Sequence, residues 1–275
     1  MSSESFSGVG GETNASKMRT LLICHDGARL DQEGLARWLA SFTNLVGIVV
    51  VRETKARSWR RVRRELKRVG ALRFLDVLAF RLYYRLRLAR KDIDWENTLL
   101  QRLFKTYPPL NAVPTLITQT PNSEEVEQFI GSQEPDIVIA RCKTLLKESV
   151  FSIPAKGTFV MHPGICPEYR NAHGCFWALA NDDLDRVGMT LLRINKGVDT
   201  GPVFGYFSYP YDARSESHVV IQHRVVFENL EKIEQKFREI YCGLSTPLDV
   251  SGRSSGTWGQ PWLSQYLKLR RRVMR

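Results

Sequence analysis

The apolar residues of this chain fall into short continuous runs that alternate with segments of helical spacing. The continuous runs are typical of strands buried on both faces of a sheet, and they cover residues 19–24, 45–51, 115–119, 136–140 and 158–161. Between them, apolar residues recur every three or four positions, which predicts helices near 35–42, 59–69, 74–88, 122–132 and 173–181. Such alternation predicts a doubly wound α/β fold, with a mostly parallel sheet and helices on both faces.

The last third of the chain has a different pattern. Apolar runs at 189–194 and 203–209 predict two more strands, and a stripe of helical spacing from Ser217 to Tyr241 predicts one long helix. Gly243 would end that helix, because glycine readily adopts the left-handed conformation of a helix terminus. A Ser/Gly-rich stretch at 251–256 then predicts a linker to a short helical extension.

The positive charge of the chain is concentrated. The net charge is +11, and residues 55–91 hold 14 Lys/Arg against only two acids, Glu65 and Asp76. A second basic cluster closes the chain, at Lys268, Arg270, Arg271, Arg272 and Arg275. Segments of this kind attract phosphates, nucleic acids or anionic membrane surfaces, although a plain solvated helix face has the same composition. We predict a disordered tail (1–17), an α/β domain (18–210) with a basic helical insertion (55–91), and a C-terminal helix with a basic docking tail (211–275).

Composition narrows the cellular setting. The five cysteines have no Cys-x-x-Cys spacing, which argues against a disulfide framework and a structural metal site. No apolar run approaches the roughly 18 residues of a membrane span, and the first 17 residues lack the apolar core of a secretory signal. We therefore expect a cytoplasmic protein that needs no metal.

Two ionisable residues stand where a doubly wound sheet places its ligands. His162 directly follows the strand at 158–161 and precedes Pro163-Gly164, and Asp199 lies in a turn bounded by Gly197 and Gly201. Two such groups from different loops suit acyl-type transfer, in which one stabilises the oxyanion and the other takes a proton from the attacking amine. Taken singly, a structural histidine and an ordinary turn are the alternatives.

The combined pattern is more specific than either residue. MHPGICPEYRNAHGCFWAL followed by GMTLLRINKGVDTGPVF resembles the folate-dependent formyltransferase family, whose pattern is Asn-x-His-Pro/Gly, Pro-x-Tyr/Trp-Arg-Gly, Gly-x-Thr-Leu and Asp-x-Gly in this order. The resemblance spans about residues 19–210 and is strongest over 154–202. It implies a Rossmann-like fold, a catalytic domain at 18–210, formyltetrahydrofolate as the formyl donor, and a primary amine as the acceptor.

The same resemblance implies the catalytic roles. His162 would stabilise and protonate the tetrahedral intermediate, while Asp199 would orient His162 and a water and relay the proton of the amine. Val160 stands where the family has its catalytic Asn and cannot donate a hydrogen bond, a loss that typically costs about 3 kcal/mol, or roughly 100- to 1,000-fold in rate. Asn171 replaces the glycine that usually follows Tyr-Arg; it is either a compensating amide donor or an ordinary loop residue.

Further residues are expected to line the two substrate sites. The donor side would comprise Arg141, Cys142, Lys143, Val198 and Thr200. The acceptor side would comprise Tyr169, Arg170, His173 and Trp177, with helix capping as the alternative role of His173.

The acceptor is expected to be an amino-sugar nucleotide or a similar small biosynthetic amine. A tRNA acceptor is disfavoured, because only about 65 residues follow the last strand, fewer than an independent domain of about a hundred residues would need. The alternatives are a methionyl-tRNA formyltransferase-like enzyme, a formyltetrahydrofolate hydrolase, and a non-catalytic homologue that binds folate or a partner. The basic helices are a candidate surface for binding an anionic partner surface, and formation of a homodimer is left open.

Overall fold

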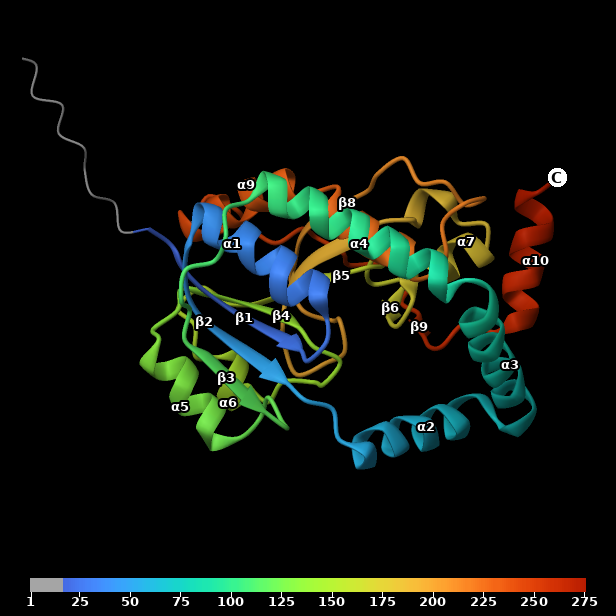
Figure 1. Cartoon of the computed structure of the whole chain (residues 1–275), viewed down its shortest axis with the longest axis horizontal. Coiled ribbons are helices and arrows are strands. Elements are labelled where there is room, and N and C mark those ends of the chain that lie inside the picture. Colours follow the sequence, from blue (N-terminus) through green and yellow to red (C-terminus); the bar gives the residue numbers. More distant parts are fainter. Residues whose placement is uncertain (1–16) are drawn as a thin grey trace, which may run out of the picture.

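The protein is organised around one seven-stranded sheet (Figure 1). The computed structural model describes residues 17–275, so that nearly all of the predicted tail at 1–17 lies outside the described residues. In spatial order the strands are β3 (Thr115–Thr118), β2 (Asn44–Val51), β1 (Arg19–His25), β4 (Ile137–Arg141), β5 (Gly157–His162), β7 (Met189–Arg193) and β8 (Val203–Phe207). The first five are mutually parallel, and β7 and β8 are antiparallel, which confirms the mostly parallel sheet.

Helices cover both faces of this sheet, as predicted. Helices α1 (Ala36–Phe42), α4 (Ala89–Thr106) and α9 (Leu230–Tyr241) lie on one face, and α5 (Glu124–Ser132) and α6 (Glu148–Phe151) lie on the other (Figure 1). The larger core is on the first side, where Trp38, Phe159 and Phe237 are fully buried and their rings pack against one another. A smaller core of aliphatic side chains fills the space under α5 and α6.

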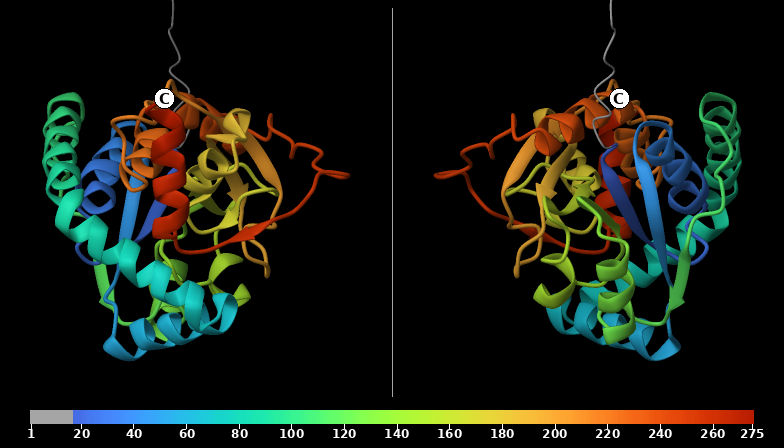
Figure 2. Two further views of the ribbon diagram at one scale, coloured as in Figure 1. Left: turned by 90° about the vertical axis from the view of Figure 1, so that its right-hand side faces the viewer. Right: turned by 90° about the vertical axis from the view of Figure 1, so that its left-hand side faces the viewer.

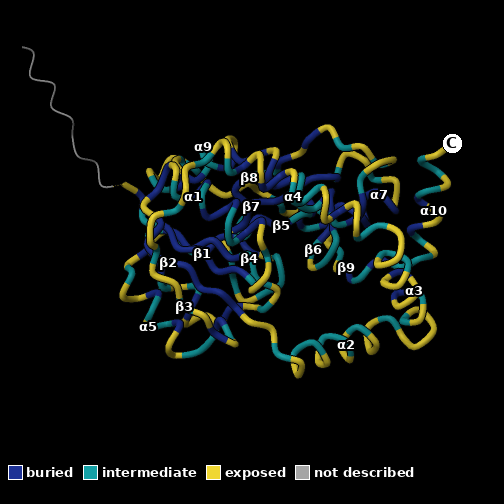
Figure 3. The backbone as a smooth tube through the Cα atoms, viewed as in Figure 1, coloured by how far each residue is buried: buried dark blue, intermediate teal, exposed yellow. Residues whose placement is uncertain are grey.

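The basic insertion forms two consecutive helices, in agreement with the apolar spacing. Helix α2 (Lys55–Val69) has no buried residue, and α3 (Ala71–Arg87) buries only Val77 and Phe80 (Figure 3). Gly70 separates them with φ = 79°, a conformation that glycine adopts without strain. The sequence did not reveal α4, which follows directly, because its buried apolar residues (Leu99, Leu100 and Leu103) are confined to the second half of the helix.

The long helix predicted over 217–241 is wrong. It is two helices, α8 (Val220–Phe227) and α9, separated at Asn229. This asparagine is buried and its side-chain amide donates to the Val225 carbonyl, a local bond that competes with the regular helical ladder. Gly243 does end α9, with φ = 74° and its N–H bonded to the Ile240 carbonyl.

After α9 the chain returns to the side of the sheet where β5 ends (Figure 2). There β9 (Thr257–Trp258) pairs in parallel with β6 (Arg170–Asn171), beyond the carboxyl end of β5. The chain ends in α10 (Leu263–Val273), which packs on α3 and α7 (Gly174–Ala180) through Tyr266 and Leu269. Over residues 17–275, no helix has the length and apolar character to cross a membrane.

Candidate active site

His162 is held at the carboxyl end of β5 by two hydrogen-bond acceptors. Its Nε2 lies 2.8 Å from the Tyr169 carbonyl oxygen, and its Nδ1 lies 3.4 Å from Oδ2 of Asp199. Neither oxygen can donate a proton, so both ring nitrogens must carry hydrogen for both contacts to be favourable. The imidazole is 5% exposed, and its surroundings therefore fix its orientation.

The charge of His162 follows from this geometry. Burial alone would lower the pKa of the imidazole, but the Asp199 carboxylate, together with Cys166 and the Tyr169 carbonyl, raises it to about 9. His162 is thus an imidazolium at neutral pH. A buried cation that is hydrogen-bonded to the Tyr169 carbonyl and paired with the Asp199 carboxylate is suited to stabilising a developing negative charge.

Asp199 reaches His162 from the hairpin between β7 and β8. Because β7 is antiparallel to β5, residues 195–201 begin near the amino end of β5 and fold back towards His162 at its carboxyl end. Asp199 has φ = 50°, in the left-handed region that Asp and Asn tolerate. Its Oδ2 also accepts the backbone N–H of Asn171 at 2.8 Å. Arg170 further anchors this loop by donating to the Val198 carbonyl at 3.1 Å.

Asn171 contacts Asp199 through its backbone N–H and not through its side chain. It has φ = 78°, which explains how it can stand at a position where glycine is usual, and its side-chain amide donates to the Trp258 carbonyl. A role for this amide as an oxyanion donor stays a prediction, and it would require the amide to leave Trp258.

Val160 shares the face of β5 that carries His162, because side chains alternate along a strand. It packs in a small apolar cluster with Cys166, Leu192 and Val203, which Val250 of the C-terminal segment also covers. An apolar side chain is therefore consistent with this environment, and the segment that follows α9 supplies part of it.

The residues expected on the donor side lie at the carboxyl end of β4 and within the loop 195–201. Arg141 donates to Asp31 at 3.0 Å and to the Met161 carbonyl at 2.8 Å. The Lys143 N–H donates to Nε2 of His25 at 2.8 Å. Cys142 packs against the smaller core. Ile194, at the start of the loop that carries Val198 and Thr200, packs against the same core. The segment 141–143 and this loop therefore border one apolar cluster. Among residues 17–275, no three His, Cys, Asp or Glu side chains are grouped to hold a metal ion.

The aromatic residues expected on the acceptor side hold the C-terminal segment. The rings of Tyr169 and Trp177 both stack on Trp258, with centroids 5.6 Å and 4.9 Å away. The Trp177 Nε1–H donates to the Gly259 carbonyl, and the Tyr169 hydroxyl donates to Asp183. Their side chains thus have structural partners, and substrate contact by them stays a prediction.

His173 stands at the start of α7 in a left-handed conformation, φ = 57°. No hydrogen bond from its side chain caps the helix, and its Nδ1 lies 2.9 Å from Nε2 of Gln222. Burial lowers the pKa of His173 to about 4, so the ring is neutral and accepts this bond.

Two residues near the site had no role in the sequence analysis. Asp31 lies on a π-helix, Leu30–Leu35, and pairs with Arg141 while both side chains are about nine-tenths buried. His25 connects the ends of β1, β2 and β4, since its Nδ1 lies 3.3 Å from the Val51 carbonyl and its Nε2 accepts from Lys143. A local pattern could not reveal these contacts, because the partners are far apart in sequence.

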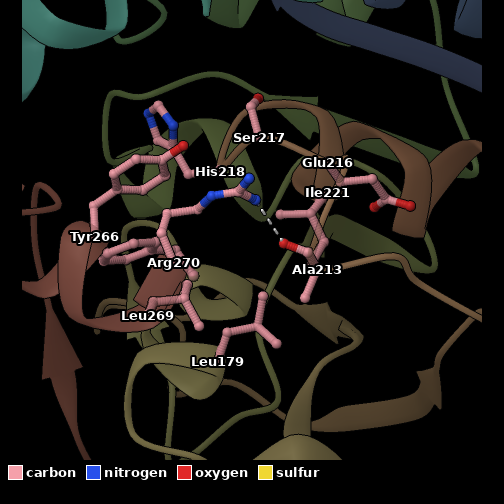
Figure 4. Close-up of a pocket in the computed structure, with 10 residues that line it drawn as sticks. Leu179, Ala213, Glu216, Ser217, His218, Ile221, Tyr266, Leu269 and Arg270 are labelled. Atoms are coloured by element: carbon pink, nitrogen blue, oxygen red, sulfur yellow. Dashed lines mark hydrogen bonds between the residues drawn. The ribbon is translucent and has the colours of Figure 1, made fainter. Parts of the chain in front are cut away.

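A separate cavity lies between α7, α10 and the segment 213–221 (Figure 4). Its volume is about 10 Å³, room for about one water molecule. Arg270 reaches across it to donate to the Ala213 carbonyl at 3.2 Å. The cavity is too small for a substrate, and we assign it no chemistry.

Comparison with known proteins finds relatives in sequence and in fold. Residues 99–234 match the formyl transferase family. Methionyl-tRNA formyltransferase from Thermotoga neapolitana is 29% identical over 130 residues, which cover 44% of this chain and 41% of that protein. The Thermotoga maritima protein of the same name is 34% identical over 92 residues, 33% of this chain and 29% of that protein. The matched parts are thus less than half the length of these relatives.

Solved structures extend the likeness to most of the fold. Phosphoribosylglycinamide formyltransferase from Anaplasma phagocytophilum superposes with a TM-score of 0.53 at 13% identity, covering 90% of this chain and 100% of that chain. A sugar N-formyltransferase from Shewanella sp. gives 0.51 at 12% identity, covering 87% and 76%. At these identities the likeness shows the Rossmann-like fold alone. Residues 99–234 of this chain thus match the formyl transferase family in sequence, and most of the chain shares the fold of these two formyltransferases.

Proposed function

We propose that this protein transfers a formyl group from formyltetrahydrofolate to a primary amine, with His162 and Asp199 as the catalytic pair. The observation that carries the proposal is the buried His162–Asp199 pair at the end of β5, with its imidazole held charged. The match to the formyl transferase family supports the reaction class. We place the reaction in residues 18–210, and we regard 55–91 as an insertion and 211–275 as a C-terminal extension.

In the proposed reaction one bond forms, one bond breaks and one proton is transferred. The amine nitrogen attacks the formyl carbon, the carbonyl oxygen becomes negatively charged, and the bond from that carbon to the folate nitrogen then breaks. The proton lost by the amine is delivered to the folate nitrogen, so that a formamide and tetrahydrofolate leave. His162 supplies positive charge next to the oxyanion, for which one of its two N–H groups must exchange its present acceptor for that oxygen.

Asp199 serves this step in two ways. Its carboxylate keeps His162 protonated, and it is the nearby base that can take the proton of the amine through a water. The Asn171 N–H and the Arg170 contact to Val198 hold the loop that carries it. The donor would lie between this loop and the segment 141–143, which border the same apolar cluster.

Val160 makes the reaction slower than it would be with a second donor to the oxyanion. The missing hydrogen bond corresponds to about 3 kcal/mol in the barrier. Asn171 could restore part of it only by releasing the Trp258 carbonyl. A hydrolase, in which water replaces the amine, and a binding protein without catalysis are the outcomes to test against.

The acceptor we favour is an amino-sugar nucleotide or another small amine. This choice is supported by the likeness in fold to a sugar N-formyltransferase and to phosphoribosylglycinamide formyltransferase. The second candidate is the amino group of methionyl-tRNA, because the curated relatives are methionyl-tRNA formyltransferases and residues 55–91 are strongly basic.

The test is a tetrahydrofolate-release assay with formyltetrahydrofolate and a panel of amino-sugar nucleotides, glycinamide ribonucleotide and methionyl-tRNA. We expect release that requires one amine and falls at least 100-fold in His162→Asn, but not in His223→Gln, a neutral histidine outside the pair. Formate release without any amine would establish the hydrolase. Folate binding with no turnover, unchanged by His162→Asn, would overturn the catalytic proposal.

A further inference from the structure

Helix α3 carries an exposed apolar stripe that the catalytic proposal does not use. Leu72, Leu75, Leu82 and Leu86 are 86%, 62%, 59% and 71% exposed. With Leu78, Ala71 and Ala79 they fall within one arc of about 120° on a helix with 3.6 residues per turn. Single exposed leucines are common on protein surfaces, but a continuous stripe of them indicates a binding surface.

The opposite face of the same helix anchors it to the protein. Val77 and Phe80 are buried, and the Phe80 ring packs on Tyr266 of α10 with centroids 5.1 Å apart. The Asp76 carboxylate also accepts the backbone N–H of Ser264 at 3.0 Å. The orientation of α3 is therefore fixed by its inner face, and its leucines are directed away from the core.

Positive charge surrounds the stripe. Arg81 and Arg85 border it on one side and Arg87 on the other, all three exposed. The adjacent α2 exposes Arg60, Arg63, Arg64 and Lys67, together with Trp59, which is 67% exposed. Between residues 55 and 91 only Glu65 and Asp76 oppose 14 Lys/Arg, and Glu65 is already paired with Arg68 at 2.7 Å.

We propose that α2 and α3 form a docking surface for an anionic lipid bilayer, in which the leucine stripe of α3 enters the interface and the arginines contact lipid phosphates. Leucine on one face with Lys/Arg beside it is the composition of helices that lie in the plane of a membrane surface. A second copy of the chain would bring the same excess of charge against itself, which disfavours self-association through this surface. The two helices lie at the periphery of the fold (Figures 1 and 3).

The test is flotation of the full chain with vesicles of phosphatidylcholine alone or with 30% phosphatidylglycerol. We expect binding to the anionic vesicles only. The double variant Leu75→Ser/Leu82→Ser should weaken it by about tenfold for each leucine that is buried in the bilayer. The matched control Leu184→Ser/Leu244→Ser replaces two leucines that are 51% and 79% exposed elsewhere, and should bind like the unmodified chain.

Charge is tested by Arg63→Glu/Arg64→Glu, which should weaken binding by about fivefold or more for each charge removed. Lys105→Glu/Lys156→Glu, at exposed positions outside both helices, is its control. All four positions are exposed, so circular dichroism should show unchanged folding.

Several outcomes would overturn the proposal. Binding that depends on the arginines but not on the leucines would mean that nothing enters the bilayer. Absence of vesicle binding, with a dimer in sedimentation that Leu75→Ser/Leu82→Ser abolishes, would assign the stripe to a second copy. Retention of tRNA without vesicle binding would assign the basic surface to nucleic acid. Of these results, only retention of tRNA bears on the proposed function, because it would favour methionyl-tRNA as the acceptor; formyl transfer itself is measured independently by the release assay.

Discussion

Replacing Asp199 with asparagine should remove the charge of His162 while preserving the loop. Asparagine tolerates the left-handed conformation seen at position 199, φ = 50°, and its amide oxygen can still accept the Asn171 N–H. The negative charge 3.4 Å from Nδ1 of His162 is lost. Because burial lowers the pKa of the imidazole and Asp199 is the largest opposing influence, ahead of Cys166 and the Tyr169 carbonyl, we expect the pKa to fall well below 9.

The size of this change sets its effect on stability. A pKa of about 9 in the folded chain, against 6.5 when unfolded, corresponds to about 3 kcal/mol. The sign follows from the raised value: this stabilisation is fully present below pH 6.5 and is lost as the pH rises through 9. Asp199→Asn should therefore lower the free energy of unfolding by about 2–3 kcal/mol at pH 6 and by much less at pH 10.

Two measurements check this prediction. NMR of histidine-labelled protein should show one imidazole that titrates near pH 9, because the pKa values of His25, His173, His218 and His223 are all lowered. Urea unfolding at pH 6 and pH 10 gives the difference in stability.

The matched control is Asp182→Asn, another aspartate with positive φ, 63°, but exposed and paired only with Arg272. It should leave the His162 titration unchanged. If His162 still titrates near 9 in Asp199→Asn, the carboxylate does not hold the imidazole charged, and the reasoning is refuted.

Three further predictions concern rate, pH and the C-terminal segment. Val160→Asn should raise amine-dependent turnover by up to about 100-fold in the release assay, with Val160→Ala as the control for size; equal turnover of the two would contradict the missing-donor argument. Turnover should fall as the pH rises through 9, where His162 loses its proton; a pH–rate profile that is flat to pH 10 would contradict its role. Glu168→Gln should lower the free energy of unfolding, measured with urea, by about 2–4 kcal/mol, because Glu168 is buried and accepts from Arg253 at 2.7 and 3.0 Å. The control Glu234→Gln, which removes one partner of a surface pair with Arg238, should lower it by less than about 0.5 kcal/mol.

The sheet could be predicted because buried parallel strands are continuous apolar runs. Every predicted strand is present, and β5 ends at His162 as its position before Pro163 suggested. Helix ends were less certain. The helix predicted near 122–132 begins at Glu124, with Ser123 in the N-cap position. The Asn122 side chain lies outside the helix, where it donates to the Leu145 carbonyl and accepts from the Lys147 N–H, tertiary contacts that a local pattern does not reveal.

The surroundings of the site could not be predicted, because they depend on contacts between distant segments. The sequence placed His162 and Asp199 in separate loops, and the structure brings them within 3.4 Å. It could not show that the Asn171 amide is bonded to Trp258, 87 positions away, or that Asp31 pairs with Arg141. Pairings of this range are decided by the packing of the whole fold.

Val160 and the C-terminal segment are best understood together. The Val160 side chain borders a cluster that Val250 also covers, and Arg253, three residues further on, is bonded to both Glu168 and the Tyr206 hydroxyl. An asparagine at position 160 would place an amide against this apolar cover, where an unpaired polar group costs roughly 1–3 kcal/mol. A valine avoids that cost and favours the position in which Val250 covers the cluster. The apolar residue and the C-terminal cover are thus mutually stabilising, and any gain in rate from Val160→Asn should be accompanied by a loosening of residues 248–253, measurable as faster amide hydrogen exchange there.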